Sequence, residues 1–305
     1  MTTKISWYRW PIPKEELREL TRRSNFKALL HIIGFLLLYG GSIVLNMYFF
    51  RAGLWPLLIV GCYLHSIVAG FMGFGAAVHE LSHGTPFRSK WLNKFFAALF
   101  AFQSWSSHVH FWESHRRHHQ YTYFRGLDKE QISDPIPFTW VDVLSWFTFD
   151  FKKFALFMKV NFRLVFGSTK LDYFAWRPML DGDQAKYRAI KTWARVQLLL
   201  HVVLLGVFIY FGLWPLIYLV TFSNFFATFL EHATGIIQHM GLRGDVPDWR
   251  VTSSTANFGP VMRFLYWNMN FHTEHHMYAG VPFYNLPKLR KTIGHDLQKP
   301  LPGFW

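Results

Sequence analysis

Long apolar runs separated by short turns are the first pattern along this chain. Residues 26–50 are apolar almost throughout, and residues 54–78 continue this pattern after a short turn. Each run exceeds the roughly 20 helical residues that cross a bilayer. A later apolar stretch is interrupted by Gly-Leu-Trp-Pro-Leu at 212–216, a pentapeptide that also forms the first turn. We therefore predict four spans in two antiparallel hairpins, over about 26–50, 54–78, 193–211 and 213–231.

The basic residues of the polar segments set the predicted orientation. Of the 32 lysines and arginines, only Arg51 falls in a predicted hairpin turn. Because cytoplasmic segments are enriched in Lys and Arg, residues 1–25, 84–192 and 232–305 are predicted to be cytoplasmic, both termini included. The predicted fold is thus an all-α integral membrane protein with a single domain, residues 1–305, whose four transmembrane helices form two hairpins and carry a cytoplasmic helical cap.

Two further apolar segments do not fit a span. Residues 95–105 are too short to cross a bilayer and are predicted to be re-entrant or part of a buried wall. Residues 138–166 alternate bulky rings with Lys and Arg, which predicts one or two amphipathic helices at the membrane surface.

Composition supports the membrane assignment. Hydrophobic residues make up 51% of the 305 residues, and only 16% are charged, against about 25% in ordinary globular domains. The single cysteine, Cys62, excludes an intrachain disulfide and a cysteine-based metal cluster. The N-terminal residues lack a short apolar segment followed by small residues, so we expect no cleaved signal peptide. The net charge of +14 favours anionic lipid or an acidic protein as partner, and no motif points to nucleic acid.

Histidine spacing supplies the candidate chemistry. Eight of the 16 histidines fall in three boxes, His-Glu-Leu-Ser-His, His-Arg-Arg-His-His and His-Thr-Glu-His-His. On a helix, separations of three and four residues place imidazoles on one side, where they can converge on a metal. Eight imidazoles on one side of the membrane suit two metals with four ligands each. The box residues are His79, His83, His115, His118, His119, His272, His275 and His276.

A ninth ligand is predicted from depth in the membrane. His79 lies 23 residues after Pro56, and His239 lies 24 residues after Pro215. At ~1.5 Å per residue both histidines emerge at the same level, just past the hydrocarbon. His232 would lie nearer the membrane, as an interface residue or a neighbour of the ligands.

Each box also has a glutamate in it or beside it, Glu80, Glu113 and Glu274. Such carboxylates could accept a hydrogen bond from a ligating histidine, fix its tautomer and offset the metal charge. Ordinary solvated carboxylates are the alternative for each of them.

The first box, read alone, has a different meaning. His-Glu-x-x-His is the signature of zinc peptidases, with two imidazoles on one helix face and the glutamate as general base. That reading leaves the two other boxes without a purpose. A metal-binding membrane protein without enzymatic activity is a further alternative.

Together, the boxes and their surroundings resemble the membrane fatty acid desaturase and hydroxylase superfamily. The similar segments are HELSHGTPFRSKWLN, HRRHHQYT and NFHTEHHMYAGVPFYNLPKL. The resemblance implies two irons held by the eight box histidines, with His239 matching a ninth ligand, and no catalytic residue beyond the ligands.

The same resemblance implies an activity. We expect an O2-dependent di-iron desaturase that abstracts hydrogens from an unactivated methylene pair of an acyl lipid or acyl chain. A hydroxylase, ketolase or other oxygenase acting on a different apolar substrate is the alternative. The chain has no Rossmann glycine fingerprint and no cysteine cluster, so electrons are expected from an external ferredoxin, rubredoxin or cytochrome. The expected location is a bacterial inner membrane.

Overall fold

The computed structural model describes residues 4–128, 130, 138–168 and 183–303. Within these residues the chain is helical, and its β contacts are isolated bridges rather than strands. The predicted all-α class is therefore confirmed for the described part of the chain. Parts of the predicted cytoplasmic region 84–192, namely residue 129 and residues 131–137 and 169–182, lie outside it.

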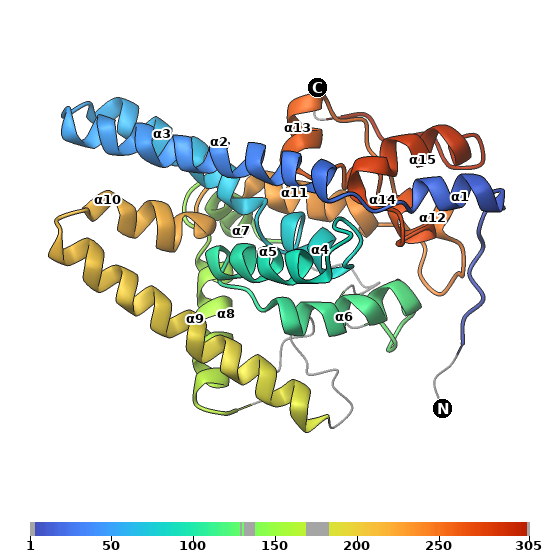
Figure 1. Ribbon diagram of the computed structural model, residues 1–305, viewed down its shortest axis with the longest axis horizontal. Coiled ribbons are helices and arrows are strands. Elements are labelled where there is room, and N and C mark those ends of the chain that lie inside the picture. The colour runs from blue at the N-terminus through green and yellow to red at the C-terminus, as the bar shows by residue number, and fades with distance from the viewer. Residues whose placement is uncertain (1–3, 129, 131–137, 169–182, 304–305) are drawn as a thin grey trace.

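The helices follow one another in a long series (Figure 1). Their bounds are α1 Lys14–Leu20, α2 Asn25–Arg51, α3 Trp55–Gly70, α4 Ala77–Ser82, α5 Lys90–Gln103, α6 His108–Tyr121, α7 Trp140–Trp146, α8 Phe151–Val165, α9 Gln184–Tyr210, α10 Trp214–Leu216, the π-helix η2 Ile217–Phe222, the 3-10 helix η3 Ser223–Phe225, α11 Phe229–His239, α12 Trp249–Thr252, α13 Pro260–Leu265, α14 His272–Met277, the 3-10 helix η4 Phe283–Asn285 and α15 Leu286–Ile293.

Among the described residues, two segments are long and apolar enough to cross a membrane. They are the segment Lys14–Arg51, which contains α1 and α2, and α9. The predicted span 26–50 coincides closely with α2, which begins where the Ser24 side chain accepts a hydrogen bond from the backbone of Lys27. A third apolar helix, α3, has only 16 residues.

The predicted span 54–78 is wrong at its C-terminal end, because it is not one continuous helix. Helix α3 stops at Gly70, turns occupy the next six residues, and α4 carries the first box as a separate short helix. Three glycines in this stretch weaken a continuous helix. Gly70 also lies against Glu231, because a Cβ there would meet its carboxylate at 3.3 Å. The break lets α4 point in a direction that α3 could not give it.

The third predicted span, 193–211, lies almost entirely within a longer helix. Helix α9 starts at Gln184, where the Asp183 carboxylate accepts hydrogen bonds from the backbone of Ala185 and Lys186. Arg195 lies inside this helix, and its Nε donates to the carbonyl of Val165 at the end of α8. A cation inside the helix is therefore satisfied by a neighbouring helix end, which the hydropathy pattern could not indicate.

The fourth predicted span, 213–231, is not one helix. It divides into α10, η2 and η3, and α11 starts afresh at Phe229. Carbonyls that the irregular turns leave free are bonded by side chains: Leu219 accepts from Tyr39 and His65, at 2.9 and 2.8 Å. Gln103 donates to Val220 at 2.6 Å. A broken helix in an apolar setting requires such internal partners.

The start of α11 is held by an adjacent segment. Asp150 donates its backbone N–H to Phe225, and Ala227 donates to Thr148, at 2.8 and 2.9 Å. Ala227 takes a positive φ of 49°, which is uncommon for a residue with a side chain. The chain therefore changes direction here, and α11 leads away from the hairpin toward the histidine boxes.

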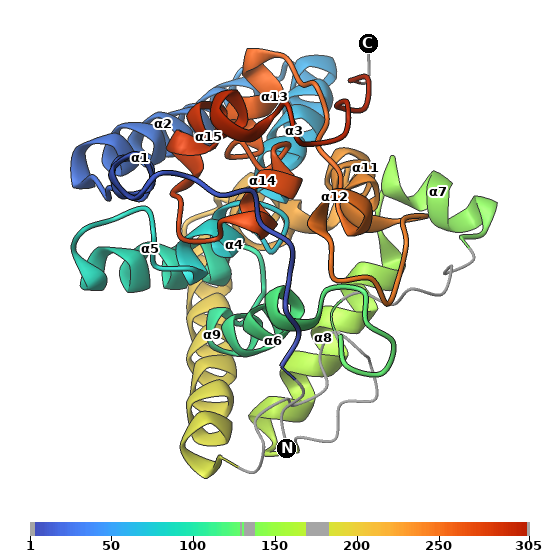
Figure 2. The same ribbon diagram turned by 90° about the vertical axis from the view of Figure 1, so that its right-hand side faces the viewer.

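The two hairpins extend in the same direction. In Figure 1 the turn between α2 and α3 and the turn between α9 and α10 both lie at the left, and the box helices α4, α6 and α14 lie toward the right. Figure 2 shows α14, α4, α11 and α12 gathered around the centre of the molecule. The predicted amphipathic segment 138–166 forms two helices, α7 and α8.

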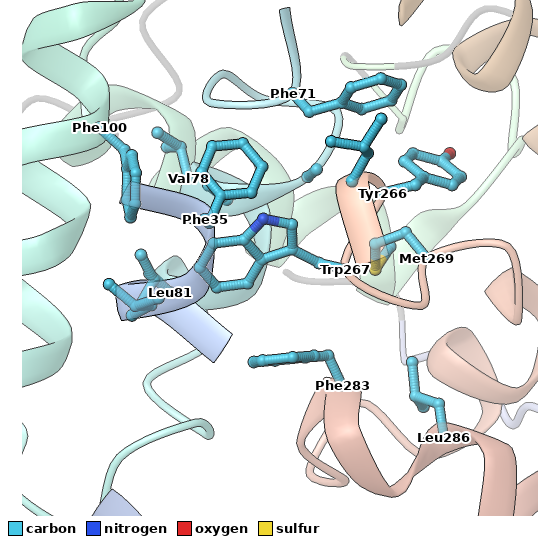
Figure 3. Packing of buried hydrophobic residues seen from close by; sticks show 14 of the residues in the cluster. Phe35, Phe71, Val78, Leu81, Phe100, Tyr266, Trp267, Met269, Phe283 and Leu286 are labelled. Atoms are coloured by element: carbon cyan, nitrogen blue, oxygen red, sulfur yellow. The ribbon is translucent and has the colours of Figure 1, made fainter. Parts of the chain in front are cut away.

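A buried aromatic cluster joins the third-box segment to the first hairpin (Figure 3). Trp267 is fully buried, with ring centroids 6.0 Å from Phe35 of α2, 5.7 Å from Phe100 of α5 and 5.0 Å from Phe283. Because α14 begins five residues after Trp267, this packing positions the third box.

We predict that Trp267→Ala lowers the stability of the fold by about 3–5 kcal/mol, because it removes a large side chain from a core that cannot fully collapse. Thermal unfolding in detergent measures the effect. Trp140→Ala is the control, since that side chain is 83% exposed. Equal unfolding midpoints for the two variants would contradict the assignment of Trp267 to the core.

Candidate metal centre

Five histidines from three helices form a first group. They come from α4, α6 and α14, and one ring nitrogen from each lies within 4.8 Å of the others: His79, His83, His115, His119 and His275. Their Nε2 atoms face each other closely. The Nε2 atoms of His79 and His275 are 3.0 Å apart, those of His83 and His115 3.1 Å, and those of His119 and His275 3.2 Å.

Four more histidines form a second group beside the first. His118, His239, His272 and His276 satisfy the same 4.8 Å criterion, and all four are buried. The Nε2 atom of His272 lies 2.9 Å from that of His239 and 3.0 Å from that of His276. The structure thus brings together all nine histidines that the sequence singled out, His239 included.

Each His-x-x-His-His box divides between the two groups. His115 and His119 of α6 belong to the first group and His118 to the second. In α14 the outer histidines of the box, His272 and His276, belong to the second group, and His275 belongs to the first. Helical geometry accounts for this, because residues four apart share a face whereas adjacent residues diverge by about 100°. The two groups therefore lie side by side, with α6 and α14 contributing to both.

The spacing of the nitrogens fits a shared metal ion. Two adjacent ligands at ~2.1 Å from one octahedral ion lie ~3.0 Å apart, and imidazole is a common ligand of iron, zinc and copper. The position of the proton on His239 also fits a metal ligand. His239 Nδ1 lies 2.8 Å from the carbonyl oxygen of Thr252, which only accepts, so Nδ1 carries the proton and Nε2 presents a lone pair.

Two carboxylates outside the boxes orient further rings. His118 Nδ1 lies 2.8 Å from Asp128, and His115 Nδ1 lies 2.8 Å from Glu130, which also accepts from the Ser114 hydroxyl. Carboxylates hydrogen-bonded to the outer nitrogen of a ligating histidine fix its tautomer and raise its basicity. Neither Asp128 nor Glu130 was predicted from the sequence. The available signal was an acidic pair within 15 residues of the second box, in the Gly-Leu-Asp-Lys-Glu segment.

Burial keeps most of these rings neutral. It lowers the pKa of His83 and of His239 to about 3, and it lowers the pKa values of the following histidines well below 6.5: His79, His115, His119, His272, His275 and His276. His118 differs. Burial disfavours its charge, but the Asp128 carboxylate outweighs this and raises the pKa of His118. Neutral imidazole is the form that binds metal.

Of the predicted neighbours of the ligands, Glu80 lies beside a box histidine. Its carboxylate is fully buried, and Oε1 lies 3.4 Å from Nδ1 of His275. Burial raises the pKa of Glu80 to about 8.

The other predicted neighbours contact different parts of the protein. Glu113 lies 2.9 Å from Lys186 of α9. Glu274 lies 2.9 Å from Arg290 of α15 and accepts from the Thr255 hydroxyl. His232 lies 2.7 Å from Asp150 and stacks on Trp146. These contacts connect helices around the centre, so we assign to the three residues a role in holding it together.

The fold and the two groups define a class: a helical protein with segments long and apolar enough to cross a membrane, in which histidines gather in two groups that could each hold a metal ion. The family comparison narrows this class. The model of the fatty acid desaturase family matches residues 53–305, and the chain belongs to that family of oxidoreductases. The resemblance seen in the three boxes is thereby confirmed.

Named relatives are similar at modest identity. The chain is 26% identical over 246 residues to the Homo sapiens sphingolipid delta(4)-desaturase/C4-monooxygenase DES2, which covers 78% of this chain and 64% of that protein. It is 27% identical over 238 residues to a Komagataella phaffii sphingolipid delta(4)-desaturase, covering 74% of this chain and 58% of the relative. The chain therefore spans less than two thirds of the length of these relatives.

Single histidine substitutions should separate the two groups. We predict that the wild-type chain binds two metal ions, and that His275→Ala or His272→Ala each loses about one, because each ring belongs to a different group. Elemental analysis of purified protein measures this. His295→Ala, an exposed histidine, should keep both ions. Full metal content in either of the first two variants would argue against the grouping.

Substitution of an orienting carboxylate should weaken binding without removing a ligand. We predict that Asp128→Asn lowers metal affinity by about 10–100-fold, the usual cost of losing such a partner. Competition with a chelator measures the affinity. Asp245→Asn, which alters a half-exposed carboxylate paired with Arg125, is the matched control and should leave the affinity unchanged.

Proposed function

We propose that the chain is an O2-dependent di-iron desaturase that removes two hydrogens from an unactivated methylene pair in the apolar chain of a lipid. The observation that carries this proposal is the convergence of nine histidines, seven of them buried and two partly buried, into two adjacent groups in a member of the fatty acid desaturase family. Iron is the metal that we assign, since imidazole binds it well and C–H cleavage requires a redox metal.

The ligand assignment follows the two groups. One iron would be held by His79, His83, His115, His119 and His275, and the other by His118, His239, His272 and His276. When bound, the two irons supply an oxidant generated from O2 and external electrons, which is strong enough for an unactivated C–H bond.

The protein's own contribution is orientation and exclusion of water. Asp128, Glu130 and the Thr252 carbonyl hold protons on outer ring nitrogens, so the inner nitrogens face the metals. The buried Glu80 carboxylate lies 3.4 Å from the outer nitrogen of His275. Because six of the eight box histidines are buried and the other two partly buried, bulk water would have little access to the reacting centre. A shift of ~1 Å in substrate position can change the outcome of such a reaction, so this rigidity matters.

We place the site at the membrane surface. In this arrangement α2, α3, α9 and the broken segment α10 to η3 form four passes, and the box helices form a cap on the cytoplasmic side, as the distribution of basic residues favours. Helix α3 is about 24 Å long at ~1.5 Å per residue, which requires local thinning of the ~30 Å hydrocarbon or extension by the turns that follow it.

The substrate is proposed to be a lipid with a long apolar chain. The relatives described above are named as sphingolipid delta(4)-desaturases, which supports this class. Electrons would come from a ferredoxin, rubredoxin or cytochrome that docks on the basic cytoplasmic face.

A second outcome is hydroxylation. The Homo sapiens relative is named both as a desaturase and as a C4-monooxygenase, so insertion of oxygen is the natural alternative. The zinc-peptidase reading is disfavoured because the second and third boxes join the first in two adjacent groups of histidines, which that reading does not explain.

Lipid analysis tests the proposal. We predict that cells expressing the chain contain a lipid that has lost two hydrogens, and that His275→Ala abolishes it whereas His295→Ala does not. Growth under isotopically labelled dioxygen separates the alternatives, since a hydroxylase would leave labelled oxygen in the lipid. An unchanged lipid profile in cells that contain the iron-loaded protein would refute the proposed substrate class.

A further inference from the structure

A basic cavity of about 500 Å³ lies where α1, α2, α15 and the segment before α5 meet. Five cations and a single carboxylate line it together with polar side chains: Arg22, Arg23, Lys27, Arg88 and Lys288, then Glu19, Ser24, Asn25 and Asn285. None of these residues belongs to the histidine groups. The cavity is therefore a separate and strongly positive feature.

The walls of the cavity are tied to each other. Asn25 donates to the Ser89 hydroxyl and accepts from the Ser89 backbone, at 2.8 and 3.1 Å. The Tyr284 hydroxyl accepts from the backbone of Ser24 at 2.7 Å and donates to the Pro86 carbonyl at 3.0 Å. These bonds join three segments that are distant in sequence. The backbone positions from which the cations extend are thus set by the fold, which lowers the cost of ordering them around a ligand.

The lining favours phosphate. Three guanidinium groups and two ammonium groups face the cavity, and guanidinium pairs with phosphate through two parallel hydrogen bonds. The start of the 27-residue helix α2 also lies here, which adds the positive end of its dipole. Glu19 is the only carboxylate in the described lining, so a doubly or singly charged phosphate meets little repulsion.

The surroundings favour a phosphate attached to a lipid. Directly beyond the cavity, Phe26 and Leu30 of α2 are exposed, the first to 75%. Trp91 and Phe95 of α5 are also exposed, the first to 66%. In Figure 2 the starts of α2 and α5 lie on the same side of the molecule. If α2 crosses the membrane, these side chains contact acyl chains, which places the cavity at the level of the headgroups, where phospholipids supply the phosphate.

We propose that this cavity binds the phosphate of an anionic phospholipid, whose acyl chains lie along the exposed faces of α2 and α5. This site is additional to the metal centre and does not depend on the proposed reaction. Because it lies at the start of a candidate membrane span, it would anchor the protein at a defined depth relative to the headgroups.

Thermal unfolding of the full chain in neutral detergent tests the site. Added phosphatidylglycerol should raise the unfolding midpoint of the wild type, and phosphatidylcholine should not. Arg88→Gln combined with Lys288→Gln should weaken the apparent affinity on the order of twentyfold, because each basic residue near an anionic lipid surface is worth roughly a factor of five. Arg88→Lys, which keeps the charge, should retain most of the effect.

Matched controls separate this site from general surface charge. Lys159→Gln combined with Arg188→Gln removes two exposed cations outside the cavity and outside α2 and α5, and should leave the lipid effect intact. Equal losses in the two double variants would overturn the proposal, as would equal effects of the two lipids. Stabilisation by inorganic phosphate alone at the same concentration would identify free phosphate as the ligand and overturn the lipid assignment. Metal content should stay unchanged in every variant, which keeps this test independent of the reaction.

Discussion

Nine imidazoles, seven of them buried, converge in two adjacent groups, an arrangement that a metal ion within each group would stabilise. In three of these rings Asp128, Glu130 and the Thr252 carbonyl engage the outer nitrogen, so the inner nitrogen presents a lone pair that a metal ion could bind. The convergence of these imidazoles is the constraint around which α4, α6, α11 and α14 are arranged. The surrounding hydrogen bonds and ion pairs keep these helices in register.

The histidines reach one common site only because two apolar segments are interrupted, one after α3 and one after η3. A straight continuation of α3 through residue 78 would carry His79 and His83 along the axis of the hairpin instead of toward α6. The interruption after Phe225 likewise redirects α11, so that His239 reaches His272. Both breaks expose backbone groups in an apolar setting, and the structure satisfies them with side chains such as Tyr39, acting on the carbonyl of Leu219.

Much of the candidate site could be predicted because its chemistry is local in the sequence. Spacings of three and four residues revealed the eight box histidines, and counting residues from Pro215 indicated His239. Asp128 and Glu130 were not predicted, because their roles depend on how the chain folds back after α6. An acidic residue in a loop also shows no periodic pattern in the sequence. Glu113 and Glu274 were chosen for proximity in sequence, yet their partners Lys186 and Arg290 come from other helices.

The sequence by itself determined the helical class, the positions of α2 and of the hairpin turns, the nine histidines and the family, because hydropathy, turn residues and short motifs are properties of contiguous residues. Only the tertiary structure decided where α3 and the fourth span break, how each His-x-x-His-His box divides between two groups, and which carboxylates orient the rings. Those features depend on hydrogen-bond partners and packing between segments up to about two hundred residues apart, as with His79 and His275.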